Sequence, residues 1–524
     1  MLEIAFRPDR AGLPMARQLA DHLETLVRSG RLLGGSKLPA SREAALALGV
    51  SRKTVIAAYD QLAARGLTAS HVGQGTFVLP GDAPSRAALR AAARAPREFA
   101  WSGLLAREPA ATPAALALRR SEWQERVPYD FRGGSVEASA LPLTDLRWAV
   151  AHPFRSRTRL REIAAHHDPA GWPPLRREIA RMLVRRGLSC EPAEIAVVNG
   201  LQHAIDLTAR VLVEPGDAVV MEQPGYFGAA LAFAARGADV LGVDVDAEGL
   251  RTDRLARVLR LRRVKLVYVT PATQSPTGAV MSPARRDALL ALADEHQVPI
   301  FEDDYDNELR YVGPVLPALK ATDPAGQIVH AGTFSKILFP GLRVGYVVAP
   351  RPLLRPLIAS RVASDFGSGV VEQAALAGLL ATRGLDRHLQ RMRRLYAGRL
   401  AAMLASLRHE MPAGTRWTEP SSGHVVWLTL PAGVDPDRLH RAALAHGVAY
   451  GRGEVFFTDG RGAEHLALAF AAVDEATIAK GVARLARAIR EVASGGRASG
   501  LRRPARSVVA GRAGRRSDGA QRAR

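Results

Sequence analysis

The sequence predicts a multidomain protein, with a small N-terminal α+β domain followed by a large α/β domain built on a mainly parallel sheet. At 524 residues the chain is too long for one ordinary hydrophobic core. Residues 1–80 combine helical periodicity with a glycine-rich end that is typical of a short hairpin. Between residues 128 and 492, short β-rich runs alternate with helical stretches, which is the order expected of a parallel sheet with helical crossovers.

The bulk composition limits the class of protein. Hydrophobic content of 47% and charged content of 23% are those of a soluble globular protein, and no run of eighteen apolar residues is present. The start, "MLEIAFRPDR", lacks the apolar core of a secretion signal, so we expect a cytoplasmic protein. A single cysteine, Cys190, excludes an internal disulfide and a cysteine-built zinc site. The formal charge of +21 and pI near 11.0 predict a polyanionic partner.

Within residues 1–80 we expect three helices and a hairpin. The first helix covers residues 14–28, the second begins with Ser41 as N-cap, and the third begins with Ser51 as N-cap. A break at residues 48–50 separates the second and third, as a helix-turn-helix requires. "LTASHVGQGTFVL" predicts a two-stranded wing. The residues expected to face the core are Leu19, Leu23, Leu26, Val27, Val55, Ala58, Tyr59 and Leu62.

Two cations, Arg52 and Lys53, stand in the first turn of the third helix, where the helix dipole disfavours positive charge. One interpretation is solvated surface charge. The other is contact with DNA, because the N-terminus of a recognition helix meets phosphates and base edges. The helix-turn-helix context favours DNA.

Three further segments follow the first domain. Residues 81–127 are rich in Ala, Arg and Pro and predict a linker, since they cannot bury enough apolar surface to fold alone. Residues 128–492 form the large domain, with buried strands expected at "EIAVVNG", "DAVVMEQP", "VKLVYVTP", "VPIFEDD", "IVHAGTFSK" and "RVGYVVAP". Residues 493–524 carry nine arginines and one acid, which predicts a basic disordered tail.

Lys336, in "GTFSKILFPGLRVGY", is one of only six lysines among 72 basic residues. Burial and a nearby cation favour the neutral amine, which can form a Schiff base with an aldehyde cofactor. Thr333 and Ser335 supply hydroxyl groups, and Arg343 supplies a fork suited to a phosphate. Alone, this pattern is weak, because most such lysines only begin a helix or lie in a loop.

The acidic run "IFEDDYDNELRY" follows a predicted buried strand and has three interpretations. A metal site is disfavoured because the run lacks histidines at ligand spacing, and a solvated acidic turn is the plain alternative. The third is that one carboxylate keeps a pyridine nitrogen protonated while Tyr305 binds the ring hydroxyl, as pyridoxal phosphate requires. Tyr226 in "MEQPGYFGA" offers a stacking ring, and "VVNGLQHAIDL" places a helix N-terminus where phosphates bind.

The first eighty residues resemble the winged helix of the GntR regulator family, including "LPASREAALALGVSRKTVIAAYDQL" and "GQGTFV". Arg65 is a departure, since family members often carry an acid there. The resemblance implies contact with double-stranded operator DNA through Arg42, Ser51, Arg52, Lys53 and Thr54, with a wing around Gly73 and Gly75.

Residues 128–492 resemble the fold-type-I aminotransferase domain, on "DPAGWPPLRREIARMLVRRGLSC", "TPATQSPTG", "FEDDYDNELRY", "GTFSKILFPGLRVGY" and "HLQRMRRLYAGRL". Its fusion to the winged helix resembles the MocR branch of GntR regulators. The resemblance implies a domain-swapped homodimer, a small-molecule effector and pyridoxal 5'-phosphate attached to Lys336 as the catalytic lysine. The implied cofactor-binding residues are Lys336, Asp303, Tyr305, Tyr226, Gln202, Ser275, Thr333, Ser335 and Arg343, and no metal is implied.

Some positions depart from the aminotransferase pattern. Ala272 and Thr273 replace a usual Ser-His pair, and Ser275 stands where aminotransferases place an asparagine. In "HLALAF", Ala467 replaces the arginine that binds the substrate carboxylate, so an ordinary α-amino acid is expected to bind weakly. Arg452 or Arg461 is a candidate substitute, with surface charge as the alternative for both. His166 and His167 are expected to be solvated, with a contact to the partner subunit's site as the other possibility.

Three functions follow from these features. The first is a transcriptional regulator whose aminotransferase-like domain senses pyridoxal phosphate or an amine-derived effector. The second is a working aminotransferase with an accessory DNA-binding head, left open by the Lys336, Asp303, Tyr305 and Arg343 set and opposed by Ala467. The third is a regulator whose second domain is purely structural and takes up no cofactor.

Overall fold

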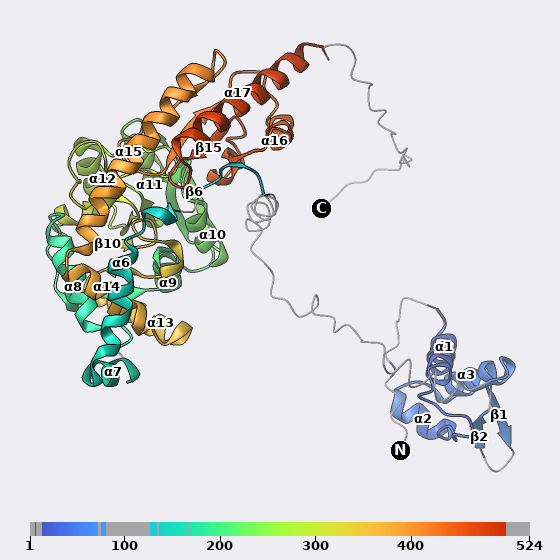
Figure 1. The fold of residues 1–524 in the computed structure, drawn as a ribbon. Coiled ribbons are helices and arrows are strands. Elements are labelled where there is room, and N and C mark those ends of the chain that lie inside the picture. The colour runs from blue at the N-terminus through green and yellow to red at the C-terminus, as the bar shows by residue number, and fades with distance from the viewer. Residues whose placement is uncertain are drawn as a thin grey trace, which may run out of the picture. The chain divides into compact units, whose positions relative to one another are not determined.

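The computed structural model describes residue 6 and residues 13–71, 75–79, 126–133, 136–165 and 168–498. It divides the chain into two compact units, Met1–Ala106 and Arg107–Arg524 (Figure 1). Most of the predicted linker and tail therefore lies outside the described residues, as do Gly73, His166 and His167. Among the described helices, none has both the length and the apolar character that crossing a membrane requires.

The first unit has the predicted helix-turn-helix and wing. Its elements are α1 (Met15–Arg28), α2 (Ser41–Leu48), α3 (Arg52–Ala64), β1 (Thr68–His71) and β2 (Gly75–Val78). The strands pair antiparallel, with Thr68 opposite Val78. Its core includes Leu19, Leu23, Val55, Ala58 and Leu62, all fully buried, which confirms the predicted faces of the first and third helices.

The ends of α2 and α3 explain the turn between them. Gly49 closes α2 in the left-handed conformation, with φ of 63°, which glycine adopts without strain. Ser51 caps α3 as predicted, accepting a hydrogen bond from the Thr54 amide at 3.1 Å. The prediction for Ser41 was wrong: Ala40 is the N-cap of α2 and Ser41 is its first helical residue. The Ser41 hydroxyl instead accepts from Arg52 Nε at 3.2 Å, which ties α2 to α3.

The second unit is built on an eight-stranded sheet of order β4-β11-β10-β9-β8-β5-β6-β7. The pairs β6·β5, β5·β8, β8·β9 and β9·β10 are parallel, and β11 runs antiparallel between β10 and β4, so the predicted mainly parallel sheet is confirmed. All six predicted runs form strands. The bounds are β4 (Ile195–Val198), β5 (Ala218–Gln223), β6 (Asp239–Asp246), β7 (Gly249–Leu250), β8 (Val264–Val269), β9 (Ile300–Asp304), β10 (Ile328–Thr333) and β11 (Gly345–Val348).

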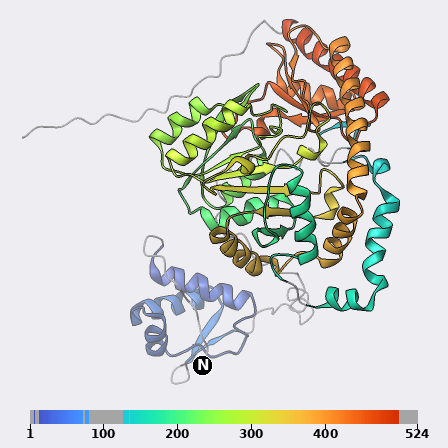
Figure 2. The same cartoon turned by 90° about the vertical axis from the view of Figure 1, so that its left-hand side faces the viewer.

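Helices cover both faces of this sheet (Figure 2), because the central strands direct apolar side chains to each face in turn. Met221, Phe301 and Val329 belong to the cluster on one face, whereas Val267 and Ile300 belong to the cluster on the other. The helices before and around the sheet are α6 (Leu143–Ala151), α7 (Arg157–Ala164), α8 (Pro173–Val184), α9 (Leu201–Leu212), α10 (Phe227–Ala235), α11 (Thr252–Leu261), α12 (Pro283–Glu295), α13 (Arg351–Asp365) and α14 (Val370–Ala381).

A second, five-stranded sheet has the order β12-β13-β15-β14-β3 and was not predicted. Its edge strand β3 comes from the start of the unit and pairs parallel with β14, although more than 300 residues separate them, with Tyr129 opposite Val448. Helix α17 continues beyond residue 492, the predicted end of the domain. The elements of this part are β3 (Tyr129–Phe131), α15 (Gly384–Glu410), β12 (Arg416–Trp417), β13 (Val425–Thr429), α16 (Pro436–Ala445), β14 (Val448–Arg452), β15 (His465–Ala469) and α17 (Glu475–Ala498).

Candidate functional site

A cavity of about 680 Å³ in the second unit is lined by residues of both sheets. From the large sheet come residues at or just beyond the ends of β4, β5, β8, β9 and β10, and from the smaller sheet residues that follow β3 and belong to β13 and β15. Openings at the carboxyl ends of parallel strands are where α/β folds bind ligands. All nine residues expected to bind the cofactor line this cavity: Gln202, Tyr226, Ser275, Asp303, Tyr305, Thr333, Ser335, Lys336 and Arg343.

Asp303 lies on β9 and faces the cavity with one oxygen unsatisfied. The Tyr268 hydroxyl donates to its Oδ2, while Oδ1 is buried and has no hydrogen-bond partner among the described residues. Burial raises the pKa of Asp303 well above its usual range, and the neighbouring Asp304 and Asp306 add to the shift. A cationic N–H donor placed at Oδ1 would satisfy this oxygen and favour the ionised carboxylate. The protonated ring nitrogen of pyridoxal phosphate is such a donor.

Lys336 lies just beyond β10, in a segment whose hydroxyl groups are ordered by one another. The Thr333 hydroxyl donates to Ser335 Oγ at 3.1 Å and accepts from the Ser335 amide at 3.1 Å. Both side chains are nearly buried and line the cavity with Lys336. The segment therefore offers two hydroxyls and an amine to one ligand.

Arg343 reaches across from the loop before β11 to the N-terminus of α9. Its Nη2 donates to the Asn199 carbonyl at 3.0 Å, directly before the helix. Gly200, with φ of 81°, allows this approach, because a Cβ there would lie 3.0 Å from Nη2. A guanidinium beside a helix N-terminus suits a phosphate dianion.

The Gln202 and Tyr226 side chains form the adjoining wall. The Tyr226 hydroxyl donates to Gln202 Oε1 at 3.1 Å, and Gln202 Nε2 donates to the Gly228 carbonyl at 2.8 Å. A Cβ at Gly228 would lie within 2.6 Å of both side chains, so glycine is needed at this close approach.

Tyr305 and Ser275 complete the predicted set. Burial, with the nearby Asp306 and Asp303, raises the pKa of Tyr305 well above its usual range, so its phenol stays a neutral donor. Ser275 follows the Thr270 turn, its amide donating to Thr270 Oγ1 at 3.2 Å. Tyr268, the partner of Asp303, was missed from the sequence. The sequence carries no local signal for this role, because Tyr268 reaches Asp303 from the neighbouring parallel strand, where it lies opposite Phe301.

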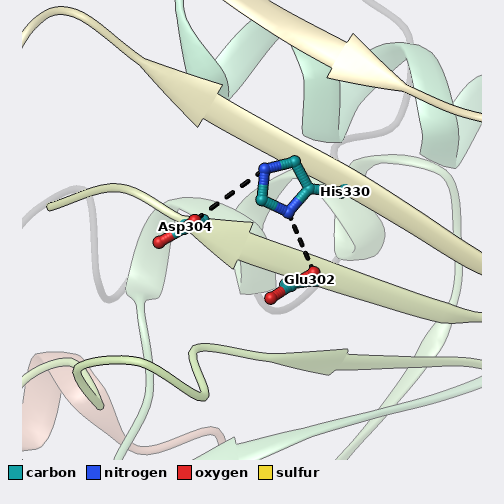
Figure 3. A group of neighbouring side chains, drawn as sticks. All are labelled: Glu302, Asp304 and His330. Carbon is teal, nitrogen blue, oxygen red and sulfur yellow. Dashed lines mark hydrogen bonds and ion pairs between the residues drawn. The ribbon is translucent and has the colours of Figure 1, made fainter. Parts of the chain in front are cut away.

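The acids on either side of Asp303 point to the opposite face of β9 and meet His330 of β10 (Figure 3). His330 Nδ1 lies 2.9 Å from Glu302 Oε2 and its Nε2 lies 3.8 Å from Asp304 Oδ2. These three side chains together have the composition of a metal site. The acidic run contains no histidine, so from the run alone a metal site is disfavoured, and the histidine comes instead from the neighbouring strand β10. Protein donors already bind their oxygens: Arg186 donates to Asp304, and the Leu319 and Lys320 amides donate to Glu302.

The His330 network also gives the neighbouring acids Glu302 and Asp303 of β9 opposite pKa shifts. Burial alone would raise the pKa of Glu302, but His330 and the two backbone amides hold the pKa below its usual range. Glu302 is therefore stabilised as an anion, while the pKa of Asp303 on the other face moves upward. The acidic run thus places Glu302 in a network that stabilises its charge and Asp303 in the cavity, where burial favours the neutral acid.

Ala467 of β15 lines the cavity, as expected from the position of the missing arginine. The two candidate substitutes do not line it. Arg452 Nη2 pairs with Glu454 at 2.6 Å and Asp437 at 2.8 Å. Arg461 pairs with Asp459 at 2.7 Å and Asp244 at 3.1 Å. Both guanidinium groups are held by other carboxylates.

In the first unit, the predicted DNA-contacting residues gather at the adjacent N-termini of α2 and α3. Arg42, Arg52 and Lys53 are exposed, and the Arg52–Ser41 hydrogen bond links the two helix ends. Gly75 of β2 lies beside Lys37, since a Cβ there would be 2.8 Å from Lys37 Cε. The unusual Arg65 pairs with Asp21 at 2.7 Å and with Glu24 at 2.5 Å, which fixes the end of α3 to α1.

Comparison with known families gives two matches along the chain. The pattern described as "Bacterial regulatory proteins, gntR family" matches residues 15–78, and that described as "Aminotransferase class I and II" matches residues 140–485. The solved kynurenine aminotransferase of Pyrococcus horikoshii is 32% identical with a TM-score of 0.69, over 75% of this chain and 97% of that chain. The large unit therefore has the fold-type-I aminotransferase fold.

Two regulators match over nearly the full length. The probable rhizopine catabolism regulatory protein MocR of Rhizobium meliloti is 33% identical over 476 residues, 90% of this chain and 93% of that protein. The HTH-type transcriptional regulator TauR of Rhodobacter capsulatus is 34% identical over 462 residues, 87% of this chain and 92% of that protein. The chain belongs to the MocR-type transcriptional regulators of the GntR family, which join a winged helix-turn-helix to an aminotransferase-like domain.

Proposed function

We propose that this regulator binds pyridoxal 5'-phosphate in the cavity and changes its affinity for operator DNA when the cofactor, or an amine that reacts with it, is bound. The observation that carries the proposal concerns Asp303, which lines the same cavity as Lys336: its Oδ1 is buried and has no hydrogen-bond partner in the part of the chain that the structure describes. The kynurenine aminotransferase of similar fold was solved in complex with PMP, the amine form of this cofactor.

Each lining residue has a role that fits its chemistry. Asp303 would accept the ring N–H, Tyr305 and Ser275 would donate to the ring oxygen, and Tyr226 would cover the ring face. Lys336 would hold the aldehyde carbon, which requires its neutral amine. When bound, the cofactor supplies an electrophilic carbon for a primary amine and a ring that withdraws electrons. The proposed phosphate-binding residues are Gln202, Thr333, Ser335 and Arg343.

DNA binding is assigned to the first unit and acts in the cytoplasm, where operator DNA is found. Ser51, Arg52, Lys53 and Thr54 at the start of α3 contact phosphates and base edges, Arg42 contacts the backbone, and the Gly73–Gly75 wing enters the neighbouring groove. We further propose a domain-swapped homodimer, because two winged helices on one dimer can read two half-sites. Ligand binding then shifts the balance between arrangements of the two heads, by as much as its affinity differs between them.

The visible absorption spectrum tests cofactor binding. Wild-type protein with added pyridoxal phosphate should show the band of the lysine-bound cofactor, and Lys336→Ala should not. Operator affinity measured with and without the cofactor, in both proteins, then tests regulation. Absence of the band from the wild type would refute the proposal, and a band of equal strength in Lys336→Ala would refute the role of Lys336.

A working aminotransferase is the second candidate, favoured by the presence of Lys336, Asp303, Tyr305 and Arg343 on one cavity. Ala467 argues against it, because the usual arginine binds substrate carboxylate bidentately. Turnover of an amino donor with a keto acid, followed as keto-acid release, distinguishes the two: a regulator is expected to give no sustained turnover.

A further inference from the structure

The cavity retains a guanidinium group on the side where Ala467 lies, but the group comes from a different strand. Arg132 follows β3 and lines the cavity, with 13% of its side chain exposed. Three lysine or arginine side chains are among the described residues that line the cavity: Arg132, Lys336 and Arg343. Lys336 and Arg343 are assigned to the aldehyde and the phosphate, so of these three cations Arg132 is the one to which the proposed function gives no role.

The strand register brings Arg132 into one row with Ala467. Phe131 pairs with Tyr450 in the parallel ladder between β3 and β14, so the next position along places Arg132 beside Gly451. Gly451 is itself directly opposite Ala467 on β15. Residues in one row of a sheet point to the same face.

Two glycines, Gly451 and Gly133, allow close packing beside Arg132. Gly451 lies between Arg132 and Ala467 and has no side chain; a Cβ there would lie 3.1 Å from the Ala467 Cβ. The chain after Arg132 also runs against β15, because a Cβ at Gly133 would lie 3.0 Å from the Ala469 Cβ. Arg132 therefore lines the cavity together with two short side chains, those of Ala467 and Ala469.

Asp130 holds this guanidinium from one side. Arg132 Nε donates to Asp130 Oδ1 at 2.9 Å and Nη2 donates to Oδ2 at 2.6 Å, a bidentate side-on pair. A guanidinium has five N–H groups in a planar fork and binds carboxylates along more than one edge. Asp130 therefore orients Arg132 through the Nε–Nη2 edge of the guanidinium.

We propose that Arg132 binds the anionic group of the effector, in place of the arginine that is absent at position 467. The effector is then a primary amine that also carries a carboxylate or a similar oxyanion, and not a simple amine. The inference rests on the proposed function, since the amine end reacts at the cofactor on Lys336.

Matched amine pairs test this assignment in the full-length, cofactor-loaded protein. The pairs are glycine and methylamine, β-alanine and ethylamine, 2-aminoethanesulfonate and ethylamine, and 4-aminobutanoate and propylamine, each titrated while the cofactor spectrum is followed. In the wild type, the acid member of at least one pair should bind about tenfold or more tightly than its plain amine, the gain expected of a charge-assisted hydrogen-bonded pair. Arg132→Gln should bring that ratio close to one without changing the cofactor band or the affinity for the plain amine.

Arg461→Gln is the matched control, because that arginine lies outside the cavity lining, and it should keep the wild-type ratio. If Arg132→Gln fails to fold, Arg132→Lys keeps the charge but loses the fork, and it should lower the ratio. A wild type that prefers no acid member, or a preference that survives both Arg132 variants, would overturn the assignment. A wild type without the cofactor band would instead refute the proposed function.

Discussion

Replacing Asp303 by asparagine is expected to have opposite effects on the apo protein and on cofactor binding. Asn keeps the shape of the side chain and an oxygen that can accept from Tyr268, but it removes the charge. Since burial raises the pKa of Asp303 well above its usual range, an ionised carboxylate there is costly without a cation. Asp303→Asn should therefore leave the free energy of unfolding of the apo protein unchanged or higher.

Cofactor affinity should fall in the same variant. A hydrogen bond to a charged group contributes about 1.5–3 kcal/mol, so loss of the carboxylate at the ring nitrogen predicts a dissociation constant raised about 10- to 150-fold. The assays are thermal unfolding of the apo protein and titration with pyridoxal phosphate, both at a pH above 7.

Glu302→Gln provides the matched control, because Glu302 is on the same strand but faces the His330 network. This change should destabilise the apo protein, since His330 and two backbone amides stabilise the ionised Glu302, and it should alter cofactor affinity far less. Equal cofactor affinity in Asp303→Asn and the wild type would refute the role given to Asp303 Oδ1. A clear loss of apo stability in Asp303→Asn would refute the argument from burial.

Three other changes have defined outcomes. Burial raises the pKa of Glu222 from its ordinary value near 4.5 to about 7, so between these pH values the folded chain holds a proton that the unfolded chain loses. The free energy of unfolding should therefore fall by about 3 kcal/mol as the pH rises through this window. Glu222→Gln should flatten that slope when unfolding is measured as a function of pH. The double change Arg52→Ala/Lys53→Ala should weaken operator binding. It should also lower the slope of log K against log[salt] by about 1 for each phosphate that the variant no longer neutralises. Arg65→Ala is the control and should leave the slope unchanged, because Arg65 pairs with acidic residues of α1. Truncation after Ala498 removes eight arginines and should lower nonspecific DNA affinity and its salt slope, with an unchanged cofactor band as the check on folding.

Local patterns were sufficient for the strands of the large sheet and for the helix-turn-helix. The runs that became β4, β5, β8, β9, β10 and β11 are short, apolar and bounded by turn residues, so periodicity and punctuation identify them. Ser51 shows the same success at a helix start, whereas Ser41 shows its limit. A serine before a helix predicts a cap, but the Ser41 hydroxyl is used by Arg52, eleven positions later.

Long-range pairing could not be read from the sequence. The smaller sheet depends on β3 joining β14, and no local signal in "YDF" indicates a partner more than 300 residues away. The same limit hid Tyr268 and His330, the partners of Asp303 and Glu302, because each comes from a neighbouring strand. Arg452 and Arg461 are candidate substitutes for the missing arginine by their closeness in sequence, and the structure pairs both with other acids.

The buried carboxylates of the aminotransferase-like domain give the proposed sensing a physical basis. Asp303, Glu222 and Asp306 each have a pKa raised first by burial, so keeping them in the fold costs free energy that a cationic ligand group can offset only at Asp303. A ligand present at 100 times its dissociation constant stabilises the state it binds by about 2.7 kcal/mol, which is a shift of about a hundredfold in an equilibrium between two states. A regulator requires its ligand to bind one conformational state more tightly than the other, whereas an enzyme requires tighter binding of the transition state than of the ground state. Ala467 offers no guanidinium to a substrate carboxylate, whereas Asp303 keeps the carboxylate that the proposed cofactor needs, and both residues line the same cavity. This combination is the one expected of the proposed sensor, whether the signal is the cofactor or an amine that reacts with it.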